Sequence, residues 1–141
     1  MKKPIILLAG ICFAALVGYA ASNLREIPFK ITSQQFEAGD SIAVQQVIAA
    51  SPELKVGDTV VVRGKYHLQS RAKASLGFFL TTKGPSARTT ISPKQQSEVE
   101  AGDGTFELEH VIPAEGRLHV SFYPRSNGSS FGGVYFGSAT P

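Results

Sequence analysis

The chain has 141 residues, of which 43% are hydrophobic and 18% charged, and its formal net charge is +3. Without Lys2 and Lys3, which lie in a segment we expect to be removed, 12 basic residues stand against 11 acidic ones. A mature net charge of about +1 argues against nucleic acid as a partner. Roughly 120 residues remain, enough for one domain with a modest core.

Residues 1–20 have the pattern of a secretory signal peptide, with two lysines followed by an apolar run of 16 residues, Ile5 to Ala20. Gly18 and Ala20 supply the small residues that a signal peptidase site requires, so we expect a signal helix cleaved after Ala20. The protein is then exported, to the periplasm or the extracellular space. The alternative is an uncleaved anchor, which would be the chain's membrane contact.

The single cysteine, Cys12, lies inside the apolar run and follows Ile11, where a lipid-attachment site usually has a small residue. We therefore interpret it as part of the signal. The mature chain then has no disulfide, no thiol nucleophile and no thiolate metal site.

Apolar residues alternate with polar ones through most of the remaining chain, the period of half-buried strands. The rows are Phe29 and Ile31; Ile42, Val44, Val47 and Ile48; Val60, Val62, Gly64, Tyr66 and Leu68; Ala74, Leu76, Phe78 and Leu80; Phe106 and Leu108; Leu118, Val120 and Phe122; Val134 and Phe136. Ser41–Ala50 also fits helical spacing, but its β-branched residues favour a strand.

Seven or eight short strands separated by turn residues predict an all-β fold, a single antiparallel β-sandwich with an immunoglobulin-like arrangement. A jelly roll or a small barrel is the alternative. We expect residues 21–28 to be a lead-in, residues 29–137 the sandwich domain and residues 138–141 a tail.

Three glycine–aspartate pairs recur, at Gly39-Asp40, Gly57-Asp58 and Gly102-Asp103. Glycine permits positive φ and aspartate accepts hydrogen bonds from nearby amides, so each pair predicts a turn. A calcium site is the alternative, but calcium sites usually need more oxygens clustered in sequence. The turn is the interpretation we favour.

The sequence predicts neither a metal site nor an enzyme. The spacing of the three histidines does not suit zinc: His67 and His119 fall on polar strand faces, whereas His110 continues an apolar row. Glu107 and Glu109 share a strand face but give no sign of a pocket that would suit glycosidase chemistry. No nucleophile elbow, phosphate-binding loop or metalloprotease motif occurs, so we expect no cofactor.

Basic residues cluster between Asp58 and Glu98, and acidic ones between Glu98 and Glu115. We expect the basic strands to lie beside the acidic ones in one sheet. The alternative is a bipolar surface that recruits an anionic partner or stacks copies of the chain. Arg63, Lys65 and His67 would then form a secondary basic patch.

The C-terminal strands hold the candidate contact site. Tyr123 and Tyr135 alternate with the apolar Phe122, Val134 and Phe136 and should face outward, close to Arg125. Tyrosine and arginine are enriched at binding hot spots. The sequence therefore predicts a non-catalytic interaction or structural module of the cell envelope, with a protein partner. The alternative is a small domain that binds carbohydrate or another envelope polymer.

Overall fold

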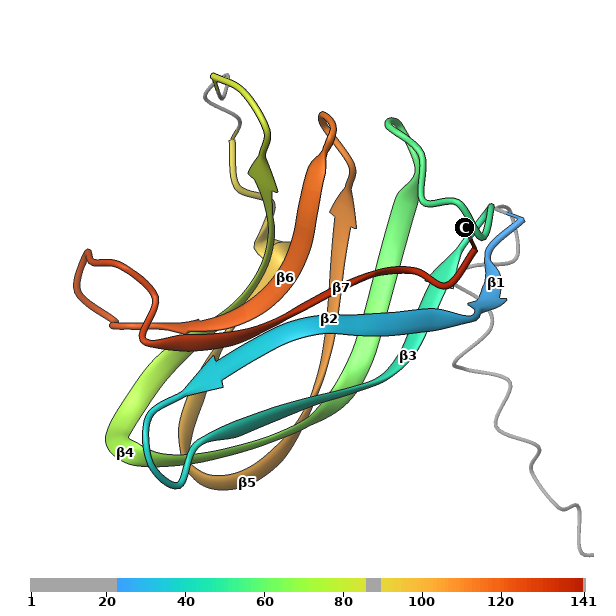
Figure 1. Cartoon of the computed structure of the whole chain (residues 1–141). Coiled ribbons are helices and arrows are strands. Elements are labelled where there is room, and N and C mark those ends of the chain that lie inside the picture. The colour runs from blue at the N-terminus through green and yellow to red at the C-terminus, as the bar shows by residue number, and fades with distance from the viewer. Residues whose placement is uncertain (1–22, 86–89, 141) are drawn as a thin grey trace, which may run out of the picture.

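In the computed structural model, which describes residues 23–85 and 90–140, the chain folds into β-strands with no α-helix in those ranges (Figure 1). The elements are β1 (Arg25–Ile27), β2 (Phe29–Phe36), β3 (Ser41–Ala49), β4 (Thr59–Thr82), the 3₁₀ turn η2 (Pro93–Gln95), β5 (Gln96–Val111), β6 (Gly116–Tyr123) and β7 (Gly132–Ser138). The all-β prediction is confirmed, and Ser41–Ala49 is a strand. The expected signal segment, residues 1–20, lies outside the described residues.

The strands form one antiparallel sheet that is nearly closed into a barrel, in the order β1-β3-β4-β6-β7-β2, with β5 paired to β4. The two packed sheets of an immunoglobulin-like sandwich are not confirmed. The sheet curves because β1 and β2 are consecutive in the chain. They are separated only by Pro28, which has no N–H to donate to a neighbouring strand. One pairs with β3 and the other with β7, so this segment joins the two ends of the strand order.

The expected lead-in contains strand β1, and its Ile27 is buried at 4% exposure. The ladder from Arg25 to Ile27 pairs with Val47 to Ala49 and places Ile27 in the core. Residues 25–27 are therefore part of the folded domain.

β4 joins two apolar rows that the sequence suggests as separate segments, Val60–Leu68 and Ala74–Leu80, into one strand of 24 residues. Its first half pairs with β3, its second half with β6, and β5 follows both halves. The register with β5 shifts between Leu68 and Lys73, where both strands bend together (Figure 1). The predicted inward rows from both halves of β4, and from β6 and β7, meet in one core.

Two of the three glycine–aspartate pairs, Gly39-Asp40 and Gly57-Asp58, lie at turns as predicted, whereas Gly102-Asp103 lies inside β5, at its register shift with β4. Gly39, Gly57 and Gly102 have φ of 87°, 94° and 106°. Asp40 accepts hydrogen bonds from the amides of Gln69 and Ser70 at 2.8 and 2.9 Å and from the Ser70 hydroxyl at 2.6 Å. The turn prediction is confirmed for the first two pairs and wrong for Gly102-Asp103, where the glycine has its positive φ within a strand and Asp103 contacts His67.

The charged segments pair as expected. In the β4–β5 ladder Arg63 lies opposite Glu107, His67 opposite Asp103 and Lys73 opposite Glu100. The basic strand therefore lies beside the acidic one, where opposite charges on neighbouring strands attract weakly.

Candidate functional site

The outer face of the sheet formed by β4, β6 and β7 carries a group of aromatic residues. Phe79, His119 and Tyr135 occupy neighbouring positions across the three strands, because Phe79 pairs with His119 and His119 with Tyr135. Tyr123 joins them through Phe79. We call Phe79, Arg117, His119, Tyr123 and Tyr135 the outer aromatic face.

The rings of this face pack against one another. The His119 and Tyr135 centroids are 4.8 Å apart, and Phe79 meets Tyr123 edge to face at 5.5 Å. Arg117 lies over the Tyr135 ring at 4.4 Å and also donates to the Ser33 hydroxyl at 3.0 Å. The two tyrosines face outward, but contact with the other rings leaves both half-buried.

Small residues beneath the rings allow this packing. A Cβ on Gly77 would overlap the Phe79 ring, so that ring lies over the glycine. A Cβ on Gly133 would overlap the Ser121 hydroxyl. Glycines in a strand often mark a place where another group approaches closely, and here the side chains of the outer face occupy that space.

His119 is the most buried member of the face, with 7% of its surface exposed. Its Nδ1 lies 2.7 Å from the Ser121 hydroxyl. Burial lowers the pKa of His119 to about 4, and the positive charges of Arg117 and His110 act in the same direction. His119 is therefore neutral at physiological pH, and its strand face is aromatic instead of the polar surface that the alternation predicts.

Arg125, the third predicted contact residue, lies beside this face. Its guanidinium pairs with Glu98 at 2.5 Å. With Phe79 and Tyr123 it lines a pocket of about 520 Å³, whereas Tyr135 lines another of about 500 Å³ with Ser33, Gln35 and Phe131. The structure thus places Tyr123 and Arg125 at one pocket and Tyr135 at the other.

Sequence reasoning missed Phe79 and Arg117 and treated His119 as an ordinary polar-face residue. The sequence could have identified Phe79 as part of this face, because it is a large apolar residue at an outward position between the buried Phe78 and the inward Leu80. Arg117 gave none, since an arginine at the start of a strand is common on protein surfaces.

The secondary basic patch is largely neutralised by β5. Arg63 pairs with Glu107 at 3.2 Å and His67 with Asp103 at 2.7 Å, while Lys65 lies opposite Thr105. Charges that are already paired within the sheet contribute little to recruiting an anionic partner.

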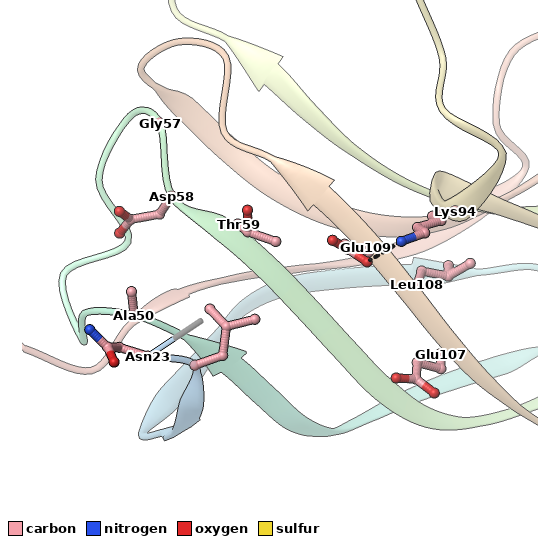
Figure 2. A pocket seen from close by; sticks show the side chains of 10 residues that line it. Asn23, Ala50, Gly57, Asp58, Thr59, Lys94, Glu107, Leu108 and Glu109 are labelled. Carbon is pink, nitrogen blue, oxygen red and sulfur yellow. Dashed lines mark ion pairs between the residues drawn. The ribbon is translucent and has the colours of Figure 1, made fainter. Parts of the chain in front are cut away.

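Another pocket, of about 620 Å³, contains both glutamates considered for catalysis, Glu107 and Glu109 (Figure 2). Lys94 reaches Glu109 at 3.5 Å, and Glu107 pairs with Arg63. Asp58, at the other side, accepts from the Ser51 hydroxyl at 2.8 Å and the Lys55 amide at 2.9 Å. These carboxylates are engaged by the protein's own cations and donors.

Across residues 23–85 and 90–140, no group of three or more His, Cys, Asp or Glu side chains is placed to hold a metal ion. Over the same ranges, no helix has the length and apolar character needed to cross a membrane. No family model, curated protein or solved structure matches the chain.

Proposed function

We propose that the protein is an exported, non-catalytic interaction module that binds a protein partner through the outer aromatic face. The observation that carries the proposal is the gathering of four rings and Arg117 on the side of the sheet away from the core. A small domain needs its aromatic residues inside, so the half-buried rings of Phe79, Tyr123 and Tyr135, held on the outer face over the buried His119, are available for contact.

The packing of Tyr135 favours a protein over a carbohydrate. A sugar that stacked on this ring would have to displace the Arg117 guanidinium, which lies 4.4 Å from the ring centroid. A protein surface can instead use the ring edges, the tyrosine hydroxyls and the arginine together. Binding of an envelope polysaccharide is the second candidate, supported by the hydroxyl and amide groups beside Tyr135 in its pocket.

The proposed location rests on the sequence of residues 1–20. Cleavage after Ala20 would release a mature chain that begins at Ala21. The intact mass of the exported protein tests this part directly, and a chain that retains Lys2 and Lys3 in the membrane fraction would contradict it.

The binding test compares three forms of the exported full-length protein: wild type, Tyr123→Ser/Tyr135→Ser, and the control Lys65→Ser/Lys73→Ser, whose lysines are exposed on β4 outside the face. After crosslinking in the envelope, we expect wild type and control to capture the same protein and the tyrosine variant to lose it. Hot-spot truncations cost roughly 2 kcal/mol each, about thirtyfold in Kd.

Two measurements accompany the capture. Melting curves establish that the tyrosine variant is folded, since both tyrosines are half-buried. Cosedimentation with insoluble envelope polysaccharide tests the second candidate. Retention on polysaccharide that depends on the two tyrosines would replace the protein partner, and unchanged capture by a folded tyrosine variant would overturn the proposed face.

A further inference from the structure

The loop between β6 and β7, residues 124–131, contains the one asparagine–glycine pair of the sequence, Asn127-Gly128. Residues 125–130 are all exposed and belong to no strand or helix. Hydrogen bonds hold the two ends of the loop, from Arg125 to Glu98 and from the Phe131 amide to the Phe122 carbonyl. Within residues 23–85 and 90–140, no group forms a hydrogen bond with residues 126–130.

An asparagine that precedes glycine is chemically labile. The backbone nitrogen of the next residue can attack the side-chain amide carbon and close a five-membered ring. A Cβ on that next residue hinders the approach, and glycine has none. Asparagine is one of the thermolabile residues that heat-adapted proteins avoid. In this loop, no hydrogen bond within the described residues holds the Asn127 side chain or the Gly128 amide away from that reaction.

We propose that Asn127 deamidates spontaneously in the folded protein. The Gly128 nitrogen forms a bond to Cγ of Asn127, the Cγ–Nδ2 bond breaks, and the former side-chain nitrogen leaves as ammonia with the proton of the Gly128 amide. Water then opens the succinimide ring. Its addition at Cγ gives aspartate, and its addition at the main-chain carbonyl carbon gives isoaspartate. Either product has a carboxylate that is ionised at physiological pH.

The new charge would lie at the proposed contact site. Asn127 and Gly128 line the pocket of about 520 Å³ together with Tyr123 and Arg125. Arg125 already pairs with Glu98 at 2.5 Å. A second carboxylate in this pocket would occupy further N–H donors of the guanidinium, so fewer would remain for a partner. This consequence rests on the proposed function, whereas the reaction itself does not.

Peptide mass spectrometry of the ageing protein tests the reaction. Trypsin cleaves after Arg125 and releases residues 126–141, in which Asn127 is the only residue with a side-chain amide. During incubation of the folded protein, we expect this peptide to gain the mass that corresponds to replacement of NH₂ by OH. The gain should be faster at mildly alkaline pH, because the deprotonated Gly128 nitrogen is the stronger nucleophile.

Two variants and one internal control assign the reaction to this pair. Asn127→Gln keeps an amide but would have to close a larger ring, so we expect no mass gain. Gly128→Ala should slow the reaction several-fold. Its Cβ would lie 3.2 Å from Cγ of Pro124 in an exposed loop, and the φ of Gly128 lies outside the left-handed region, so the loop can accept alanine. Asn23 is equally exposed but precedes Leu24, and it should stay unchanged.

The same measurement on chain unfolded in guanidinium shows whether the fold permits the reaction. We expect the folded protein to react within a few-fold of the unfolded rate. A peptide that changes only in the unfolded chain would overturn the proposal, because the fold would then hold Asn127 away from the Gly128 nitrogen. A peptide that stays unchanged in both states would overturn it as well.

Crosslinking in the envelope tests the effect on the contact site. Asn127→Asp imitates one product, and Asn127→Gln is its neutral control. We expect Asn127→Asp to capture several-fold less of the partner, and equal capture would contradict the effect on Arg125. Should wild type capture no protein at all, the proposed function fails, whereas the peptide masses still decide the deamidation.

Discussion

His119 shows how the surroundings of a single residue change its chemistry. It lies on the outer face of β6, yet Phe79 and Tyr135 contact its ring and leave it 7% exposed. Removal of water disfavours the imidazolium, and the guanidinium of Arg117 adds repulsion. The result is a neutral histidine whose Nδ1 is close to the Ser121 hydroxyl.

This burial predicts a loss of stability in acid. A histidine in an unfolded chain titrates near pH 6.5, whereas the pKa of His119 in the fold is about 4, so the unfolded state binds the proton first. The neutral His119 therefore stabilises the fold fully above about pH 6.5, and this stabilisation is lost as the pH falls from about 6.5 through about 4. The total loss in the free energy of unfolding is roughly 3 kcal/mol. Urea unfolding between pH 7 and pH 4 measures it.

His119→Asn removes the titrating group while its amide can still reach Ser121, so we expect a shallower dependence of stability on pH. Part of the dependence of stability on pH should remain in this variant, because burial also lowers the pKa of His110. His67→Asn is the matched control, since His67 is more exposed and pairs with Asp103. An unchanged slope in His119→Asn would show that His119 is not the group responsible.

At the scale of elements, β4 organises the molecule because both halves of the sheet pair with it. Asp40, in the turn between β2 and β3, accepts hydrogen bonds from Gln69 and Ser70 and so stabilises the bend in the middle of β4. Burial by itself would raise the pKa of Asp40, but hydrogen bonds from the Ser70 hydroxyl and the amides of Gln69 and Ser70 outweigh it and hold the pKa below its usual value. Its carboxylate thus links a short turn to the middle of β4.

Asp40→Ala should therefore destabilise the fold by roughly 2–4 kcal/mol, because it leaves the partly buried donors of residues 69 and 70 without their charged acceptor. Asp103→Ala is the control. Its carboxylate is 88% exposed and pairs with His67, so the loss should stay under about 1 kcal/mol. Denaturant unfolding at neutral pH measures both, and equal losses would mean that Asp40 has no special role at the bend.

At the scale of the whole molecule, stability comes from one apolar core lined by nearly every strand. The turns at Gly39-Asp40 and Gly57-Asp58 use protein donors: Asp40 binds residues 69 and 70, and Asp58 binds Ser51 and Lys55. These carboxylates already have the partners that a cation would replace.

We therefore expect chelator and reductant to leave the melting temperature of the mature protein unchanged. The sequence has one cysteine, Cys12, in the segment that we propose is cleaved, and the turn aspartates Asp40 and Asp58 are occupied by hydrogen-bond donors. Thermal melting with and without EDTA or dithiothreitol provides the measurement. A fall of several degrees with EDTA would reveal a bound ion, because removal of a ligand removes its linkage stabilisation.

Local patterns in the sequence determined the buried rows and most of the strands and turns, but not strand β1 or the union of two apolar rows into β4. Alternation marks which side chains of a strand share a face, and glycine followed by aspartate marks a turn, so both depend on residues close together in the chain. These features include the buried Phe78, Phe122 and Val134 and the positive φ of Gly39, Gly57 and Gly102. The outward placement of Tyr123 and Tyr135 followed from the same parity.

The opposite charges of the two segments predicted the pairing of β4 with β5, but only the tertiary structure decided which of the other strands are neighbours. Phe79, His119 and Tyr135 meet because β4, β6 and β7 pair in one register, although Phe79 and Tyr135 are more than fifty residues apart in the chain. Likewise, the sheet curves toward a barrel because β1 and β2 pair with different strands on either side of Pro28. Pairing between distant strands depends on closure of the whole sheet, which no short stretch of sequence encodes.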